Sequence, residues 1–370
     1  MHKIIPEGFK DDVSAAVATE HKFKNMIIEH FQSNGFDLVK TPLIEFTENN
    51  NASNTFKISV KKNEKKLNIR DDITLQVARL SENRLYKKKQ PLKLCYYGEV
   101  VRKEGSMLRP ERQFQQIGAE CIGDDSFLAD VEILELAYTS LKLVGIKKII
   151  IEISSRVFYD KFFQKITNDD KKTEIKRLIK LKDLKRILKI LDKGNHKYLK
   201  DLFECTGIYN IKKNKLDNLG IDKNTSNEIS NIKNIVKNFS YKNNDISFFI
   251  DLCEIDDKNY HSGVRFTFFS HNVRGEIAKG GRYFVKKFNN NNKVATGFTC
   301  YMDSILRASS AKLTQKKILI PFDLSHTQVN KLLKKGYSVF KYNGDLKISR
   351  KLSKDYNCEF YFEKNKVKRS

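Results

Sequence analysis

The sequence predicts an α+β fold, and three features of the chain carry this prediction. Residues 13–34 repeat apolar side chains at helical spacing and end at an Asn-Gly pair that suits a helix C-cap. Residues 92–102 are rich in aromatic and β-branched residues, and a Gly- and Pro-containing loop joins them to a second strand at 113–123. Residues 156–240 are dominated by Lys, Leu and Ile with helical periodicity, so we expect a helical insertion there.

The remaining elements follow from the same criteria. A short strand at 66–70 and a helix that begins behind Asp71-Asp72 precede the two central strands. A helix with a strong apolar face is predicted at about 128–143, followed by a buried strand. After the insertion the chain returns to strands and closes a first domain, 1–310, with a strand that turns into a helix. The buried strand is 147–155, and the segments after the insertion are 246–254, 264–270, 273–281 and 295–308.

The last 60 residues, 311–370, have a pattern of their own. Short apolar segments alternate with helical ones in the order β-α-β-α-β. This order is typical of a small α/β unit, so we expect a second, small C-terminal domain.

Charge and composition argue against several classes of function. The formal charge of +25 attracts phosphates where it is clustered, but the 55 Lys and 15 Arg are spread thinly among Asn and Ile, so nucleic acid is not an expected partner. No apolar run reaches the ~20 residues that span a bilayer, and the first residues lack a secretory h-region, so we expect a cytoplasmic protein. Six cysteines without a CxxC pair, and histidines without metal spacing, predict no metal, no disulfide framework and no cofactor.

The strand at 113–123 gives the first indication of a ligand site. Side chains alternate along a strand, so Gln116 and Glu120 face one way, on either side of Gly118, while the apolar residues between them face the other. Polar groups beside a glycine form a floor for a small ligand. An ordinary solvated sheet face explains the pattern equally well.

Three further features each have two interpretations. The pair Gly280-Gly281 permits close approach of the backbone to a ligand, or marks a strand end or bulge. The pair Asp71-Asp72 is a helix N-cap, with or without a second role. His261 is a ligand contact or a packed histidine.

Taken in chain order, these segments resemble the histidyl-tRNA synthetase family of class II synthetases over about residues 6–310. The most specific segment is RQFQQIGAE, with Arg102 ten residues before Arg112. Two segments, IRDDITLQVAR and RPERQFQQIGAE, are closer still to a paralogous group, the regulatory subunits of ATP phosphoribosyltransferase. The full set is PEGFKD, NGFDLVKTPLIE, NIRDDITLQVAR, YYGEVVRKEG, RPERQFQQIGAE, YHSGVRF, AKGGRY and ATGF.

The resemblance implies a class II aminoacyl-tRNA synthetase-like fold, with a six-stranded antiparallel sheet flanked by helices and a dimer formed partly through the segment ending at Pro42. It also implies a pocket for histidine. Asp72 and Glu120 would meet the ammonium group, and aromatic residues would surround the imidazole. The implied histidine-binding residues are Asp72, Thr74, Arg102, Gln116, Glu120, Tyr260, His261, Arg282 and Tyr283. The chain departs from the family at Asp71, where proline is usual, at His261, where tyrosine is frequent, and at Phe284, where aspartate is usual.

The same resemblance argues against synthetase activity. Activation of an amino acid by ATP builds negative charge on phosphorus, and the family meets this charge with three arginines. Arg102 keeps the first of these positions, whereas the second falls on Asp256 and the third on Ser304. A single catalytic arginine is worth about 10³–10⁵ in rate. Because two of the three are replaced, we expect the chain to have no synthetase activity and no catalytic residues.

The sequence therefore predicts a histidine-sensing regulatory subunit that pairs with a short-form catalytic subunit of ATP phosphoribosyltransferase, the enzyme of the first step of histidine biosynthesis. We expect a hetero-oligomer with a dimeric regulatory core, feedback by histidine and activation of the partner. The last 60 residues are too few for the complete anticodon-binding domain of the synthetases. Two alternatives stay open, a divergent histidyl-tRNA synthetase and an RNA-binding class II paralogue.

Overall fold

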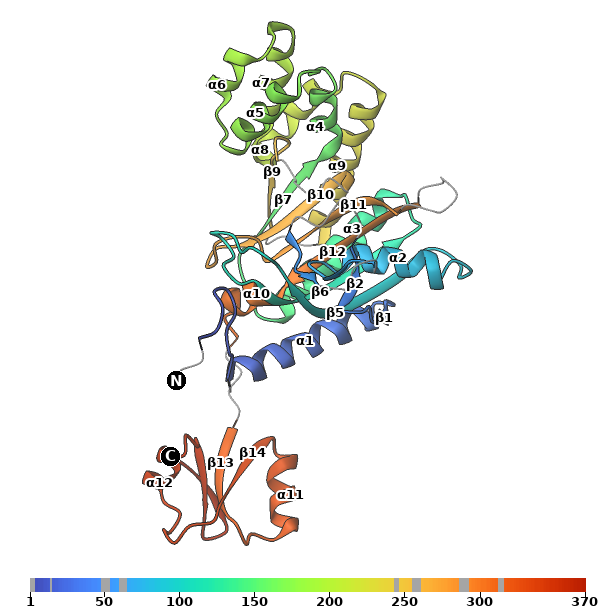
Figure 1. Cartoon of the computed structure of the whole chain (residues 1–370). Coiled ribbons are helices and arrows are strands. Elements are labelled where there is room, and N and C mark those ends of the chain that lie inside the picture. The colour runs from blue at the N-terminus through green and yellow to red at the C-terminus, as the bar shows by residue number, and fades with distance from the viewer. Residues whose placement is uncertain are drawn as a thin grey trace. The chain divides into compact units, whose positions relative to one another are not determined.

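A computed structural model describes residues 4–13, 15–47, 54–59, 65–242, 246–254, 261–285, 293–311 and 316–370. The chain divides into a large unit, built from residues up to Asp12 together with 20–311, and a small unit that contains Lys312–Ser370. Both units combine helices with sheets (Figure 1), so the predicted α+β class is confirmed.

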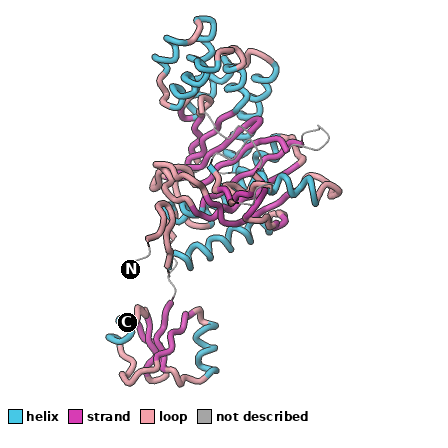
Figure 2. Tube along the Cα trace, viewed as in Figure 1, coloured by secondary structure: helices cyan, strands magenta, loops and turns pink. Residues whose placement is uncertain are grey.

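A nine-stranded sheet forms the centre of the large unit (Figure 2). Its strands are β1 (Asp37–Val39), β5 (Leu92–Val101), β6 (Gln113–Ile122), β7 (Ile149–Ser155), β8 (Gly207–Ile208), β9 (Ser247–Ile250), β10 (His261–Ser270), β11 (Ala278–Val285) and β12 (Lys293–Tyr301). They lie in the order β1-β5-β6-β12-β11-β10-β7-β9-β8. The six neighbours from β5 to β7 pair antiparallel, as expected. The whole sheet is nevertheless mixed, because β1 joins β5 and β9 joins β7 in parallel.

Two helices cover the apolar face of this sheet. The helix α1 (Ala15–Ser33) places Phe31 edge-on against Phe298 of β12, and α3 (Phe127–Leu143) packs on β6, β11 and β12. The end of α1 confirms the predicted cap, since Gly35 has a φ of +83° and the amide of Phe36 donates to the carbonyl of Phe31. Two further helices, α2 (Thr74–Arg84) and α10 (Met302–Ala308), also contact β6.

A three-stranded sheet lies between α1 and α2 in the chain. Its strands are β2 (Ile44–Phe46), β3 (Lys57–Ile58) and β4 (Leu67–Ile69), in the order β2-β4-β3. The strand predicted at 66–70 corresponds to β4.

The helical insertion follows β7, and Figure 1 shows its helices gathered beyond β7 and β9. It contains α4 (Arg156–Phe163), α5 (Asp169–Lys180), α6 (Leu184–Ile190), α7 (His196–Cys205), α8 (Tyr209–Lys212) and α9 (Lys223–Lys242), with 3₁₀ turns η2 (Lys193–Asn195) and η3 (Lys213–Leu219). The periodic run around residues 174–191 is divided into α5 and α6, because Lys182 between them has a φ of +55°. The insertion also contributes a short strand, β8, which pairs with β9 at the edge of the large sheet.

One strand prediction was wrong in its position. The segment 273–281 was expected to be a strand, whereas β11 begins only at Ala278 and continues to Val285. Gly275 adopts a φ of +83°, which turns the chain before it can pair. The pair Gly280-Gly281 therefore lies inside the strand, not at its end.

The small unit carries its own four-stranded sheet. Its elements are β13 (Lys316–Pro321), α11 (His326–Lys334), β14 (Tyr337–Tyr342), α12 (Arg350–Asp355), β15 (Phe360–Glu363) and β16 (Lys366–Arg369). The five expected elements occur in the expected order, and β16 follows as a further strand that pairs antiparallel with β15. β16 consists of four exposed residues and was not predicted from the sequence.

Candidate ligand-binding site

The face of the sheet opposite α1 and α3 carries the polar residues predicted from β6. Gln116 and Glu120 point to this face and are 0% exposed, while Ile117, Ala119 and Cys121 are buried on the other. The predicted alternation of β6 is therefore confirmed. Its polar side chains lie inside the protein, where each needs a hydrogen-bonding partner.

The carboxylate of Glu120 lies between two tyrosines. Tyr283 donates to its Oε2 at 2.9 Å, and Tyr96 donates to its Oε1 at 3.3 Å. Burial raises the pKa of Glu120 to about 8, although the hydrogen bonds from Tyr283 and Thr74 act in the opposite direction. Gly297 of β12 makes room for this carboxylate, since a Cβ there would lie 1.7 Å from Oε2.

A chain of hydroxyl groups extends from Glu120. The Tyr96 hydroxyl lies 2.6 Å from the Thr299 hydroxyl and 3.1 Å from the Thr74 hydroxyl. Tyr96 pairs with Gly118 across β5 and β6, and a Cβ on Gly118 would lie 2.4 Å from the Tyr96 hydroxyl. The expectation of a bare glycine floor is thus corrected, because the phenol of Tyr96 fills the space above Gly118.

The second polar residue of β6 connects to the start of α2. Gln116 accepts a hydrogen bond from the amide of Ile73 at 3.1 Å and directs its Nε2 toward Asp72 Oδ2 at 3.4 Å. Asp72 is partly exposed and also accepts from the amide of Thr74 at 2.9 Å. The N-cap position of α2 is Ile73, so Asp72 stands one residue before it, where it accepts from the first amide of the helix and presents a carboxylate to the site.

The predicted residues on β10 and β11 are divided between two faces. His261 is buried and pairs directly with Tyr283, so both side chains point to the polar face. Tyr260, predicted beside His261, lies outside the described residues.

Arg282 does not join the other predicted residues. Its guanidinium pairs with Asp130 of α3 at 2.6 Å and donates to the carbonyls of Asp125 and Ser126. The prediction that Arg282 lies in the pocket was wrong, because consecutive residues of a strand face opposite sides and Tyr283 occupies the polar one.

Arginines also gather where β5 and β12 end. The guanidinium of Arg102 lies 4.8 Å from the ring centre of Phe114, and that of Arg109 lies 3.7 Å from the ring centre of Tyr301. Arg109 is buried and forms ion pairs with Glu276 and Asp303, each at 3.3 Å.

Ser304, at the third family position, is 1% exposed and accepts hydrogen bonds from Arg109 and Arg307 at 3.3 Å. Asp256, at the second family position, lies outside the described residues. The structure thus brings Asp72, Thr74, Gln116, Glu120 and Tyr283 together and places Arg102 at the end of the neighbouring strand β5.

Two members of the cluster, Tyr96 and Thr299, were not predicted from the sequence. Tyr96 stands in the strand next to β6, but its position opposite Gly118 depends on a strand register that one sequence does not reveal. Thr299 directly follows the ATGF motif and alternates with buried neighbours in β12. This alternation was the signal that could have placed Thr299 on the face away from Phe298.

Three further observations concern the described part of the chain. Its residues contain no group of three or more His, Cys, Asp or Glu arranged to hold a metal ion. All six cysteines are buried and free. None of the described helices is both long and apolar enough to cross a bilayer.

A family model described as histidyl-tRNA synthetase matches residues 8–305. The chain belongs to the histidyl-tRNA synthetase family. Within it, similar curated proteins are ATP phosphoribosyltransferase regulatory subunits, as the motifs indicated. The one from Rhodospirillum centenum is 27% identical, covering 90% of this chain and 88% of the relative. The one from Paramagnetospirillum magneticum is 28% identical, covering 86% and 85%.

Solved structures of the histidyl-tRNA synthetase family share the fold of this chain. An ATP phosphoribosyltransferase regulatory subunit/histidyl-tRNA synthetase from Bacillus halodurans C superposes with a TM-score of 0.79 at 21% identity, covering 97% of both chains. Histidyl-tRNA synthetase from Nostoc sp. PCC 7120 gives a TM-score of 0.78 at 17% identity, covering 98% of this chain and 91% of that one. The class II fold predicted from the motifs is confirmed.

Proposed function

We propose that this chain is a non-catalytic regulatory subunit of ATP phosphoribosyltransferase that binds histidine and controls a short-form catalytic subunit. One observation carries the proposal: a fully buried carboxylate, Glu120, is held by hydroxyl groups, whereas the buried Arg109 and Arg265 are already paired with acids. Such a site suits the positive charge of an amino acid better than a polyphosphate. The names of the curated relatives support the same role.

Histidine would bring its ammonium group between two carboxylates. The charge of Asp72 contributes to the raised pKa of Glu120, so the two groups repel each other when both are ionised. A cation between them removes this repulsion. Thr74 and Gln116 add a hydroxyl and an amide, the neutral polar groups that fix the orientation of a small ligand.

The imidazole would lie toward β10 and β11. Tyr283 and His261 face the same side there and supply an aromatic wall. Tyr260 belongs to this wall in the proposal, on the basis of the family resemblance. Arg282 is excluded from it, because its guanidinium is engaged by Asp130 on the other side of the sheet.

The proposed lack of synthetase activity rests on the pairing of two buried arginines. Both lie on the polar side of the sheet and could in principle replace the missing family arginines. Arg109 already pairs with Glu276 and Asp303, and Arg265 pairs with Glu254 at 3.0 Å. A paired cation offers little net charge to a triphosphate, so these residues do not restore the electrostatic stabilisation that the reaction requires.

Self-association is proposed through the segment that ends at Pro42 and continues into β2. The apolar side chains of Leu38, Leu43, Ile44 and Phe46 are each at least 42% exposed. A run of exposed apolar side chains near an edge strand is typical of an interface. A second copy of this chain would cover it and form the dimeric core.

Control of the catalytic subunit requires that histidine bind one arrangement of the complex more tightly than another. Coupling energies of this kind are typically about 1–3 kcal/mol. Without histidine, the regulatory subunit would hold the catalytic partner in its active arrangement.

The proposal is tested by titrating L-histidine into the full chain in a calorimeter. We expect saturable binding that is lost in E120Q. The matched control is E152Q, which changes a glutamate on β7 whose pKa burial also raises, to about 7, and should bind normally. Robust histidine-dependent exchange of ATP with pyrophosphate would instead identify a divergent synthetase. Salt-sensitive binding of tRNA without a response to histidine would identify an RNA-binding paralogue.

A further inference from the structure

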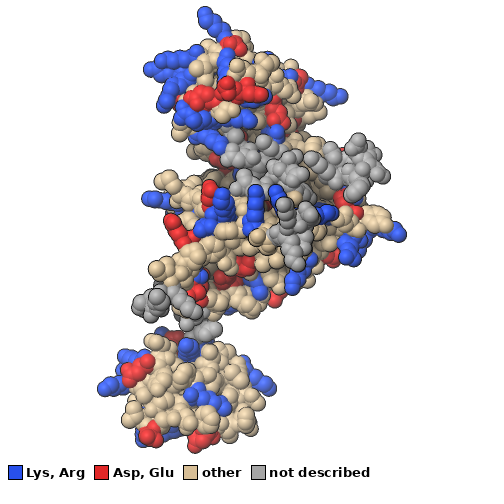
Figure 3. All heavy atoms as spheres, in the orientation of Figure 1, with Lys and Arg blue, Asp and Glu red and all other residues tan. Residues whose placement is uncertain are grey.

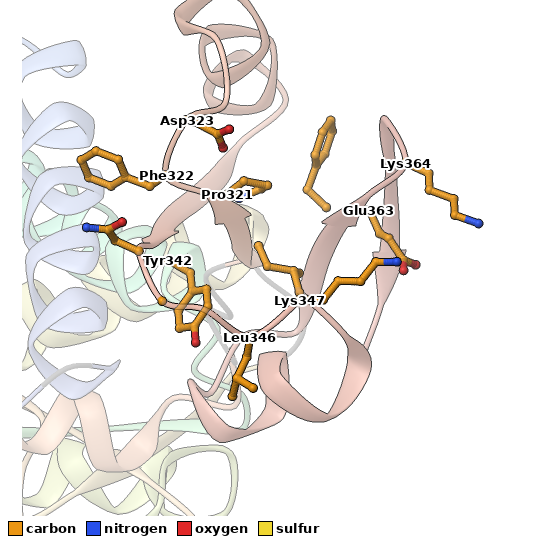
Figure 4. Close-up of a pocket in the computed structure, with 12 residues that line it drawn as sticks. Pro321, Phe322, Asp323, Tyr342, Leu346, Lys347, Glu363 and Lys364 are labelled. Atoms are coloured by element: carbon orange, nitrogen blue, oxygen red, sulfur yellow. The ribbon is translucent and has the colours of Figure 1, made fainter.

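The small unit contains a hollow of about 440 Å³ at one end of its sheet (Figure 4). Its walls come from the residues at and just after the carboxyl ends of three strands, beginning with Pro321 at the end of β13, Tyr342 at the end of β14 and Phe362 in β15. None of the residues predicted to bind histidine lines it. This volume is within the ~300–1,000 Å³ range of small-molecule sites.

The topology of the small unit places this hollow where α/β sheets bind ligands. β13 lies between β14 and β15, and both pair with it in parallel. Ile318 and Ile320 of β13 pack with α11, whereas Leu319 packs with α12, so the two helices cover opposite faces. The chain therefore winds away from β13 in both directions, and the crevice at the carboxyl ends beside such a switch point is the usual ligand position.

The walls of the hollow expose apolar side chains that the unit does not use in its own core. Phe322 is 57% exposed and Leu346 is 66% exposed, while neither belongs to the two buried clusters beside α11 and α12. Figure 4 shows both at the rim, with Tyr342 between them. These surfaces suit a flat apolar ring.

The charge around the hollow is positive. Residues 316–370 contain 14 Lys and Arg against 5 Asp and Glu, which gives 14 − 5 = +9. Within the hollow, the carboxylate of Glu363 is paired with Lys368 at 2.7 Å. Lys347 and Lys364 also lie near Glu363, and all three lysines lower its pKa. Asp323 also lines the hollow. Its charge and that of Glu363 are together smaller than the charge of the three lysines, so the surplus favours an anion.

We propose that this hollow binds a small organic anion that carries a flat apolar ring, with Phe322 and Leu346 contacting the ring and Lys347 and Lys364 the anionic group. The site is independent of histidine binding at Glu120. Adenosine 5′-monophosphate has both the ring and the anion, and it serves as the probe. Adenosine and ribose 5-phosphate each supply one half of this chemistry.

The experiment is a titration of the full chain, followed by the backbone amide signals of residues 316–370 in nuclear magnetic resonance spectra. Adenosine 5′-monophosphate should shift the amides around Pro321, Tyr342 and Phe362 in a saturable manner, and each half-probe should bind more weakly. The double variant K347Q/K364Q should weaken binding by about fivefold or more. The matched control K331Q/K334Q removes the same charge from α11 and should stay within about twofold of the unchanged chain.

Three outcomes would overturn the proposal. Equal binding of adenosine and the monophosphate would remove the role of the anion. Saturable shifts outside the hollow, or equal effects of the two double variants, would place binding elsewhere or reduce it to general charge attraction. Tighter binding of a ten-nucleotide RNA than of the monophosphate at the same amides would identify an RNA surface in place of a small-molecule site.

Discussion

The phenol of Tyr283 donates a 2.9 Å hydrogen bond to the carboxylate of Glu120, although the two residues are 163 positions apart in the chain. Their strands are separated only by β12, where Gly297 leaves the space between them free of a side chain. The buried acid and its donor depend on this arrangement of three strands. A charged ligand on the polar face would therefore change the ionisation of Glu120.

The stability of the unliganded chain should fall as pH rises from about 4.5 to about 8. Glu120 has a pKa of about 8 in the folded chain against its ordinary value of 4.5, so the folded state keeps a proton that the unfolded state loses in this range. The loss is on the order of 5 kcal/mol from this group alone. Urea unfolding of the chain and of E120Q, at pH 5 and pH 8, measures it. The account is contradicted if both proteins lose the same stability between these pH values.

Histidine binding should release a proton at pH 7. Glu120 is mainly protonated in the free site, and the ammonium group of the ligand favours the carboxylate. Affinity should accordingly rise by up to about tenfold between pH 6.5 and 7.5. Calorimetry in phosphate and Tris buffers at pH 7 detects the proton through the difference in apparent enthalpy. A binding enthalpy that is equal in both buffers, for the unchanged chain and for E152Q, would show that Glu120 does not titrate on binding.

The substitution R282A should reduce stability without changing histidine affinity. It leaves Asp130 buried and without the cation that it pairs with, which typically costs about 3–5 kcal/mol. The effect on binding should stay within about twofold, because the Arg282 side chain lies on the face covered by α3. Thermal unfolding and histidine titration of the same variant separate the two effects. A variant of normal stability that no longer binds histidine would show that Arg282 contributes to the histidine pocket.

Restoring the family arginine as S304R should destabilise the chain. Ser304 is buried and already contacts the guanidinium groups of Arg109 and Arg307, so a third cation meets both steric and electrostatic repulsion. We expect a loss of at least about 2 kcal/mol and no gain of pyrophosphate exchange. S304A, which adds neither bulk nor charge, is the control. If S304R folded normally and catalysed exchange, the nucleotide site would be intact apart from this one residue.

The sequence allowed much of the fold to be predicted, for reasons visible in particular elements. The period of apolar residues identified α1, and the aromatic strand β5 with the alternating strand β6 identified the centre of the sheet. The two edge strands of the large sheet were not predicted, since β1 and β8 are only three and two residues long. The start of β11 was predicted too early, because the apolar Ile277 extends the strand pattern back toward the preceding loop.

The site was predicted less completely than the fold. Local alternation placed Gln116 and Glu120 on one face, and the family motifs supplied Asp72, Thr74 and Tyr283. Two expectations about the site differ from the structure. The filling of the space above Gly118 by Tyr96 depends on strand register, which one sequence does not reveal. The orientation of Arg282 follows from alternation along β11, because Arg282 and its neighbour Tyr283 must face opposite sides.

The central claim is that histidine acts through this chain on a separate catalytic subunit. The most direct measurement is the rate at which the short-form transferase from the same cell joins ATP to phosphoribosyl pyrophosphate, with and without this chain and with increasing histidine. The account predicts activation by the unchanged chain, inhibition by histidine, and activation without histidine inhibition for E120Q. A transferase rate that is unaffected by the chain and by histidine would contradict it.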